Sequence, residues 1–241
     1  MDTGIYVAMS KELGILRDMD TTANNLANVD TTGFNGADLL FKDYLADGTA
    51  KEGKVAYADD YTTYRDTSQG QLRLTNNPLD AAIEGNGYFT VKTLLGIRYT
   101  RNGSFRINGS GILVTAEGYH VLDSANQDIL FDPADKVIQI RDDGTINVDN
   151  ADRALLNIVQ FDNPQLMERA GDSYYKSDAK PRPAENFTVA GGMLEASNVK
   201  PVIALTHMMY VSRSINDTAT YMSTIDTLIR KASDTLAKVY S

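Results

Sequence analysis

Residues 201–241 read PVIALTHMMYVSRSINDTATYMSTIDTLIRKASDTLAKVYS. Apolar or small residues recur there every three or four positions, at Leu205, Met208, Ser212, Ile215, Ala219, Met222, Ile225, Ile229, Ala232, Leu236 and Val239. This spacing is typical of the buried seam of a long helix in a coiled coil. Pro201 suits the first position of a helix, where its missing N–H costs nothing, and neither Gly nor Pro follows it. We therefore predict a helix that begins at Pro201 and continues to the end of the chain.

The other end of the chain shows a shorter version of the same pattern. Apolar residues recur with helical spacing at Ile5, Met9, Leu13, Leu16, Met19, Ala23 and Leu26. The helix is expected to end near Asn28, because the cluster Asp30-Thr31-Thr32-Gly33 favours turns.

The two predicted helices differ in length. At 1.5 Å per residue, the first would be about 36 Å long and the second about 60 Å long. About 16 residues of the longer seam would then have no partner within the chain, so other molecules would have to cover their apolar stripe. The alternative is a self-contained helical hairpin that caps the rest of the molecule.

The middle of the chain is expected to form strands. Short β-branched or aromatic runs occur at Tyr61–Tyr64, Tyr88–Val91, Gly111–Thr115, Val137–Ile140 and Leu155–Phe161. We expect positive φ angles for tight hairpins at the dipeptides Asn86-Gly87, Asn102-Gly103, Asn108-Gly109 and Asp143-Gly144. The predicted fold is α+β, with long N- and C-terminal coiled-coil helices flanking a central antiparallel β domain. Its parts are an N-terminal helix in residues 1–30, an extended connector in 31–68, the β domain in 69–192 and a C-terminal helix in 193–241.

The composition excludes several classes of function. The 241 residues carry 23 Lys plus Arg against 32 Asp plus Glu, and the net charge of −9 argues against a nucleic-acid partner. The chain has no Cys and two His, His120 and His207, which leaves little for metal binding. Paired carboxylates such as Asp59-Asp60 are expected by chance in so acidic a chain. We therefore expect no enzyme, with no catalytic residues, no cofactor and no metal.

The start of the chain and its hydropathy bear on its location. Met1–Ile5 lacks the basic and apolar pattern of a cleaved signal peptide, and no apolar run approaches the roughly 20 residues that span a membrane. We expect a protein that is not inserted in a membrane and that, if exported, uses another route.

Several motifs, spread along the chain, are more specific. They are Ala23-Asn24-Asn25-Leu26-Ala27-Asn28-Val29-Asp30-Thr31-Thr32-Gly33-Phe34, Gln69-Gly70-Gln71-Leu72, Ala82-Ile83-Glu84-Gly85-Asn86-Gly87-Tyr88-Phe89, Tyr99-Thr100-Arg101-Asn102-Gly103-Ser104-Phe105, Gly111-Ile112-Leu113-Val114-Thr115 and Leu194-Glu195-Ala196-Ser197-Asn198-Val199-Lys200-Pro201-Val202. In this order they resemble the motifs of the bacterial flagellar axial proteins, the rod, hook and hook-associated proteins. The chain is short for a hook protein, and the connector before Gly70 lacks the extra stretch of the distal rod. The resemblance therefore favours a proximal rod protein, although the segment Thr93–Gly96 is abbreviated and leaves the conformation of that hairpin open.

The resemblance implies a structural subunit of the flagellar basal body, in the periplasm-spanning rod that transmits torque from motor to hook. Terminal helices of many subunits would pack as concentric coiled coils, with the β domain outside them. The implied partners are further copies of the chain, other proximal and distal rod subunits and the flagellar type III export apparatus, which would pass the chain unfolded and uncleaved. The alternatives are a distal rod subunit, or a secreted β-domain binding module with an oligomerising helical stalk.

Candidate subunit-interface residues follow from the two seams and from the Asn-rich motif. Asn is unusual inside a helix, so the three Asn side chains either form hydrogen bonds between subunits or mark the fraying end of the helix. The predicted interface residues are Ile5, Met9, Leu13, Leu16, Asn24, Asn25, Leu26, Asn28, Leu205, Met208, Ile215, Met222, Ile225, Ile229 and Leu236.

Overall fold

The computed structural model describes the backbone of residues 2–47, 54–171 and 173–239, and the side chains of residues 9–40, 62–171 and 173–235. The contacts divide the chain into two compact units. The helical unit contains the described parts of residues 1–27, 37–64 and 200–241, and the β unit consists of Asn28–Gly36 and Arg65–Val199.

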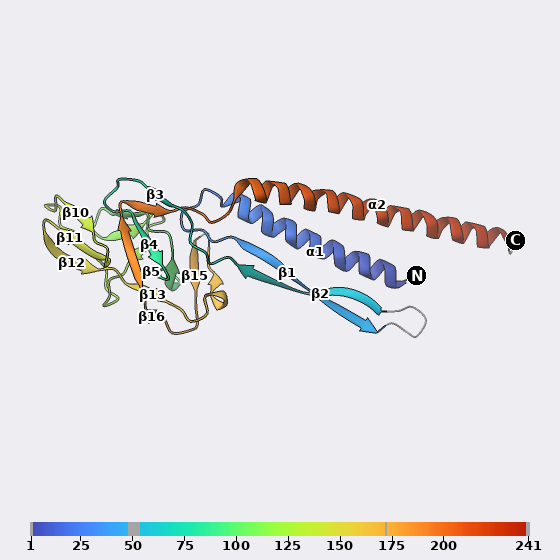
Figure 1. Ribbon diagram of the computed structural model, residues 1–241, viewed down its shortest axis with the longest axis horizontal. Helices are drawn as coiled ribbons and strands as arrows, with labels where there is room; N and C mark the ends of the chain where they lie inside the picture. Colours follow the sequence, from blue (N-terminus) through green and yellow to red (C-terminus); the bar gives the residue numbers. More distant parts are fainter. Residues whose placement is uncertain (1, 48–53, 172, 240–241) are drawn as a thin grey trace. The chain divides into compact units, whose positions relative to one another are not determined.

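The helical unit contains both predicted helices. They are α1 (Asp2–Ala27) and α2 (Pro201–Val239), and α2 begins at the proline that the sequence indicated. The two helices pack side by side in opposite directions, and α2 continues beyond the start of α1 (Figure 1). The α+β fold class and the positions of both helices are thus confirmed.

The helical unit also contains two strands, β1 (Ala37–Asp47) and β2 (Lys54–Arg65), which pair with one another. The sequence predicted an extended connector here but no pairing, because residues 31–68 show no clear alternation of polar and apolar side chains. Residues 59 and 60 lie in β2, and their side chains are outside the described residues.

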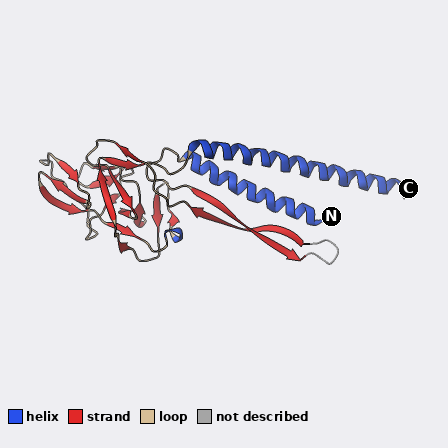
Figure 2. Ribbon diagram, in the orientation of Figure 1, coloured by secondary structure: helices blue, strands red, loops and turns tan. Residues whose placement is uncertain are grey.

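The β unit is built from short antiparallel strands (Figure 2). Its elements are β3 (Leu72–Leu74), β4 (Ala81–Gly85), β5 (Tyr88–Thr93), β6 (Gly96–Thr100), β7 (Phe105–Ile107), β8 (Leu113–Thr115), β9 (His120–Val121), β10 (Ile138–Ile140), β11 (Thr145–Val148), β12 (Ala151–Leu155), β13 (Ile158–Gln160), the 3-10 helix η1 (Pro164–Leu166), β14 (Glu168–Arg169), β15 (Tyr174–Lys176), β16 (Arg182–Pro183), β17 (Phe187–Gly191) and β18 (Met193–Glu195). The main sheet has the order β14-β15-β6-β5-β9-β8-β7, and β13 joins it by pairing with both β5 and β16. Smaller sheets are β10-β11-β12, β17-β4 and β18-β3. Since β18 lies within residues 193–195, the β unit continues past residue 192 and the chain becomes helical only at Pro201.

The core of the β unit surrounds the central strand β5. Tyr88, Phe89, Thr90 and Val91 are all buried, so both faces of this strand are covered. A separate aromatic cluster contains Tyr88, Tyr99, Val159, Met167 and Tyr175. The unit therefore has an apolar core of its own, which does not depend on the helices.

The turn glycines differ from the sequence expectation. Positive φ was expected at all four predicted dipeptides, which lie in the described β unit, but only Gly144 has it, at +84°. Gly87, Gly103 and Gly109 lie outside the positive region, and Gly85, with φ +98°, supplies it beside Asn86-Gly87. Gly103 is required for a different reason, because a Cβ there would lie 1.7 Å from the carbonyl oxygen of Ala81.

Candidate functional site: the helical seam and the motif junction

Within its own chain, α2 buries a stripe that is displaced by one residue from the predicted seam over part of its length. Val211 and Thr218 are its most buried described side chains, 2% and 7% exposed, and Met208, Ile215 and Met222 beside them are half-buried. These positions alternate by three and four residues, as in a heptad pattern. The predicted seam instead passed through Ser212 and Ala219.

The predicted interface residues fall into three groups. Met9, Leu13, Leu16, Leu205 and Ile229 are 49%, 53%, 45%, 48% and 37% exposed, respectively. Leu26, Met208, Ile215, Met222 and Ile225 are half-buried. The side chains of Ile5 and Leu236 lie outside the described residues. The exposed members form apolar surface on both helices that the chain itself leaves uncovered.

The described side chains of the last part of α2 are uncovered in the single chain. Every described side chain from Asp226 to Thr235 is exposed, including Leu228 at 60%. Asp18 of α1 lies beside His207 of α2, with the carboxylate and the ring nitrogen 3.0 Å apart, which marks the register of the two antiparallel helices. At 1.5 Å per residue, α2 is about 20 Å longer than α1, in agreement with the length argument from the sequence.

The three motif asparagines have different positions. Asn25 donates through Nδ2 to the carbonyl of Ala37 at 2.7 Å, and its Oδ1 accepts from the Ala37 N–H at 3.0 Å. This amide therefore attaches α1 to the start of β1 within one chain. Asn28 accepts from the Thr31 hydroxyl at 3.1 Å, in the turn that ends the helix, and Asn24 is exposed. Hydrogen bonds from Asn24 and Asn28 to other subunits remain a prediction.

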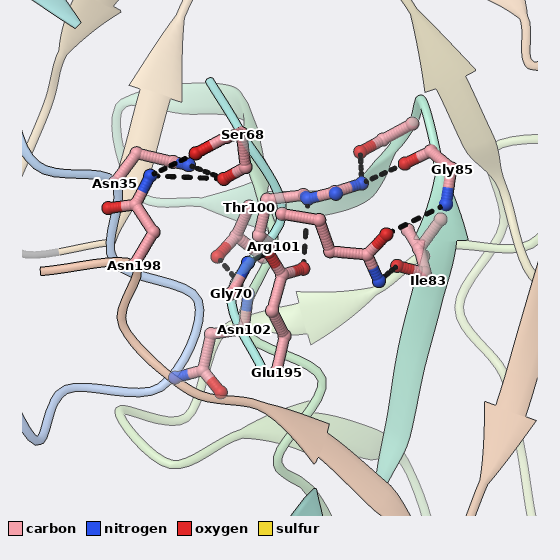
Figure 3. Close-up of polar contacts among 12 residues, drawn as sticks. Asn35, Ser68, Gly70, Ile83, Gly85, Thr100, Arg101, Asn102, Glu195 and Asn198 are labelled. Carbon is pink, nitrogen blue, oxygen red and sulfur yellow. Dashed lines mark hydrogen bonds and ion pairs between the residues drawn. The ribbon is translucent and has the colours of Figure 1, made fainter. Parts of the chain in front are cut away.

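A second region of interest lies within the β unit, next to the residues at which the chain enters and leaves that unit. The four crossings follow residue 27, residue 36, residue 64 and residue 199. The segments of the β unit that lead into them are 28–36, 65–70 and 195–199, and these carry parts of three of the motifs that define the resemblance. We call the hydrogen-bonded contacts among these segments, together with Arg101, the motif junction (Figure 3).

Asn198 connects the three segments of the motif junction. Its Oδ1 accepts from the Gly36 N–H at 2.8 Å, and its Nδ2 donates to the carbonyls of Asp66 and Ser68 at 2.9 and 3.0 Å. Its own N–H donates to the Phe34 carbonyl at 3.3 Å. One side chain thus binds the segment after α1, the segment after β2 and the segment before α2.

A buried ion pair lies beside Asn198. Arg101 Nε is 3.0 Å from Glu195 Oε2, and the two side chains are 7% and 2% exposed. Arg101 Nη1 also donates to the carbonyls of Gly85 and Gly87 at 2.9 and 2.8 Å, and Glu195 Oε1 accepts from the Gly70 N–H at 3.0 Å. Because removal of one partner would leave a buried charge, this pair holds its surroundings in one arrangement.

Burial is the main influence on the pKa of Glu195. Desolvation raises the pKa of Glu195 above its ordinary value, and Arg101 and the Gly70 N–H act in the opposite direction. Figure 3 shows Arg101 and Glu195 within the network that also includes Asn198 and Ser68.

Glycines allow the segments to approach closely at the motif junction. A Cβ on Gly33 would lie 2.5 Å from the Asn102 nitrogen, and one on Gly70 would lie 1.8 Å from the Ala196 carbonyl oxygen. The Gly33 N–H donates to the Glu195 carbonyl at 2.8 Å. Larger residues at either position would push the segments apart.

Sequence reasoning found the motifs but not their contacts. It gave no role to Arg101, Glu195 or Asn198, because their motifs mix polar and apolar residues and nothing local marks these side chains as buried. Which charge pairs with which could not be inferred, because the partners lie 94 positions apart in the sequence.

The described residues contain no group of three or more His, Asp or Glu side chains that could hold a metal ion. His120 instead pairs with Asp128, with Nδ1 and Oδ2 3.0 Å apart. Within the same part of the chain, no helix is both long and apolar enough to cross a membrane.

Comparisons with known proteins cover the whole chain. Residues 82–148 match the flagellar hook protein FlgE/F/G D1 domain, residues 190–235 match the flagellar basal body rod FlgEFG protein C-terminal domain, and residues 16–35 match the flagella basal body rod protein family. The chain is 34% identical to the flagellar basal-body rod protein FlgF of Caulobacter vibrioides, over 99% of this chain and 100% of the relative. It is 31% identical to FlgF of Rhizobium meliloti over 98% of both, and 28% identical to the rod protein FlgG of Bacillus subtilis over 94% of this chain and 96% of the relative.

The nearly full-length matches include both helices, the β unit and the motif junction within it. With nearly full-length identity above 30% to FlgF proteins, the chain belongs to the flagellar basal-body rod protein family, as a FlgF-like structural subunit and not an enzyme.

Proposed function

We propose that this rod subunit polymerises through its terminal helices into the proximal part of the rod, the drive shaft that transmits torque from motor to hook. The observation that carries the proposal is the uncovered apolar surface of the helical unit. Met9, Leu13 and Leu16 on α1 and Leu228 and Ile229 on α2 are each more than a third exposed. Burial of such surface is favourable by about 25 cal/mol per Å².

The geometry of this surface favours an open polymer. The described side chains of residues 226–235 of α2 are all exposed, so no described part of the chain covers them. A helical array of subunits, in which α2 of each chain packs between neighbouring helices, would cover them. A heterologous contact of this kind generates an open filament when its rotation does not close.

The motif junction supports the proposed transmission of torque. Any force that passes along the chain from the helices to the β unit must travel through the four chain crossings. Asn198 binds the segments next to three of them, and the Arg101–Glu195 pair anchors the same segments to strands of the core. A torsional load would therefore be shared among several segments instead of pulling on one strand.

The finer assignments rest on the comparisons and the resemblance. The proximal position is supported by the higher identity to FlgF, at 34%, than to FlgG of Bacillus subtilis, at 28%. The proposed partners are further copies of this chain, other proximal and distal rod subunits and the flagellar export apparatus. The proposed location is the periplasm-spanning rod, reached without a cleaved signal peptide.

The test is electron microscopy of basal bodies purified from cells with and without the gene. We expect rods that end before the distal segment when the gene is absent, and full rods when it is restored on a plasmid. Complete rods in the deletion strain would overturn the proposal.

A further inference from the structure

The paired strands β1 and β2, which we call the ribbon, have their base in the β unit. Residues 34–36 of that unit lead into β1, and Arg65, the last residue of β2, already belongs to it. The Asp66 N–H donates to the Gly36 carbonyl at 2.8 Å, so the pairing of the two strands continues into the base. A two-stranded ribbon is at best marginally stable by itself in water, so its stability depends on the groups that hold it.

Gln165, in the 3-10 helix η1, binds the returning strand of the ribbon. Its Oε1 accepts from the Arg65 N–H at 3.0 Å, and its Nε2 donates to the Arg65 carbonyl at 2.7 Å. The side-chain amide thus takes the place that a neighbouring strand would have beside the last residue of β2. The Gln165 N–H in turn donates to the Asn163 side chain at 3.2 Å, which fixes the backbone from which this amide projects.

The side chain of Arg65 makes a second attachment to the same segment. Its guanidinium donates to the carbonyl of Pro164, at 3.0 Å, and to that of Met167. It also lies over the ring of Tyr175, 4.4 Å from the centroid, where a cation–π contact is favourable. Met167 and Tyr175 are buried members of the aromatic cluster, so the returning strand is attached to the core of the β unit.

Arg169, in β14, binds the segment that leads into the ribbon. Its Nη2 donates to the Asn35 carbonyl at 2.7 Å, and its guanidinium lies 4.4 Å from the centroid of the buried Phe34 ring. In the register of β14 and β15, Arg169 pairs with Tyr175, and β15 pairs with β6 in the main sheet. Residues 164–169 therefore hold both sides of the ribbon base and are themselves joined to the main sheet.

The ribbon is also attached to the first helix. β1 contacts α1, and the two hydrogen bonds between Asn25 and Ala37 join the end of α1 to the first residue of β1. A continuous series of contacts thus leads from α1 along the ribbon to the main sheet. These contacts are separate from the hydrogen bonds of Asn198, so the fold contains a second connection beside the motif junction.

We propose that the ribbon is a strut that carries part of the torsional load from α1 into the main sheet, with Gln165 and Arg169 as the positioning residues at its base. The proposal rests on the proposed role of the chain in torque transmission and names a further set of residues that would serve it. The hydrogen bonds and the two guanidinium–aromatic contacts hold the base in parallel. They must therefore break together before the ribbon can separate from the sheet.

The first measurement is amide hydrogen exchange by NMR on the purified full-length subunit. In Gln165→Ala/Arg169→Ala, we expect the Arg65 N–H to exchange at least about fivefold faster than in the wild type, since loss of one hydrogen bond has about this effect. The matched control is Arg106→Ala/Gln139→Ala, which removes the same two side-chain types from exposed positions on β7 and β10. Equal exchange in the wild type and the test variant would show that Gln165 does not hold the ribbon base.

The second measurement is swimming under load. Each variant is expressed as the sole copy in flagellated cells, rods are counted by electron microscopy, and swimming is followed as the viscosity of the medium is raised. We expect the test variant to assemble rods and to swim in dilute medium, but to stop at viscosities at which the control still swims. A merely structural role would lower the number of rods, and the loss of swimming would not depend on load.

The other outcomes overturn the proposal. Faster exchange with normal swimming under load would show that the base is held but carries no load. If the test variant forms no rods, Gln165→Glu/Arg169→Lys decides, because it keeps an acceptor for the Arg65 N–H and a cation beside Phe34. We expect this variant to assemble and to swim under load, and a lack of rods would show that the segment acts in assembly instead. The exchange measurement uses the free subunit, so its result does not depend on the proposed polymerisation through the helices.

Discussion

Substitution of Ile229 by Asp separates the stability of the monomer from the assembly of the rod. Ile229 lies in the part of α2 that α1 does not reach, and it is 37% exposed in the single chain. If neighbouring subunits cover this side chain, an Asp there places a carboxylate in an apolar interface. If the helix instead remains free, the same substitution replaces one partly exposed side chain with another.

The magnitudes of the two effects differ. In the monomer, the change in helix propensity is a few tenths of a kcal/mol and little apolar contact is lost, so we expect less than about 1 kcal/mol. For a chain of this size, that corresponds to about 2–4 °C in Tm. In the rod, the lost burial of Ile is worth about 1 kcal/mol, and a charged Asp adds several kcal/mol per subunit. A total near 4 kcal/mol weakens each contact about 1000-fold.

The assay combines thermal unfolding of the purified protein with motility and electron microscopy of basal bodies. The matched control is Thr227→Asp, which adds the same charge two residues away on another face of α2. Thr227 is exposed, and its hydroxyl donates only to the Ser223 carbonyl within the helix. Asp226→Ala is a less suitable control, because Asp226 forms an ion pair with Arg230 at 3.0 Å.

We expect Ile229→Asp to keep its Tm within a few degrees and to abolish rods, and Thr227→Asp to change neither. A large loss of Tm for Ile229→Asp would show that the residue packs within its own chain, as in the self-contained helical hairpin. Normal rods with Ile229→Asp would show that this part of α2 is not in an interface, and the argument from helix length would be refuted.

The remaining predictions concern the β unit. Gly103→Ala should lower the free energy of unfolding by about 3 kcal/mol or more, because the new Cβ meets a backbone oxygen, whereas Gly109→Ala, into open space, should change it by less than about 1 kcal/mol in chemical denaturation. Asn198→Ala should lower the free energy of unfolding by about 2–4 kcal/mol, and Asn198→Asp should keep only the hydrogen bond accepted from the Gly36 N–H. Unchanged denaturation midpoints would show that this amide does not hold the three segments together. Removal of residues 202–241 should preserve the β-sheet circular dichroism and abolish motility, and loss of the sheet signal would contradict the division into units. Since burial raises the pKa of Glu195 above its value in the unfolded chain, stability relative to Glu195→Gln should fall as the pH rises from the unfolded-state pKa through the folded-state pKa; the opposite slope in urea titrations would show that Arg101 dominates.

The helices could be predicted because their signal is local. The three- and four-residue spacing of apolar residues and the position of Pro201 set the type and start of α2 without knowledge of any partner. The sequence did not determine which face of α2 is buried. Ala204 and Leu205 are neighbours, as are Val211 and Ser212, and either residue of each pair is small or apolar enough to belong to a buried stripe. Only the packing shows that Val211 is covered while Leu205 is 48% exposed.

The hairpin turns show a different limit of sequence reasoning. An Asn-Gly dipeptide is a good indicator of a turn, yet the same glycine is also used where two segments approach closely. At Gly103 the second requirement applies, because the Ala81 carbonyl lies where a Cβ would be. Nothing local distinguishes the two cases, since the contacting segment is 22 positions away.

The motif junction could not be predicted because all its contacts are long-range, but its composition has a consequence for assembly. Its hydrogen bonds join residues 28–36, 65–70 and 195–199, which all belong to the β unit. The β unit therefore holds the ends of the segments that lead into α1 and α2 whether or not the helices have partners. Most of the stability of a helix in a protein comes from packing of its apolar face, so a helix with uncovered apolar surface gains stability when a neighbour covers that surface. A subunit that joins the growing rod therefore needs to order only its helices against their neighbours. The segments that lead into these helices are already fixed by the motif junction, so less conformational entropy is lost on incorporation.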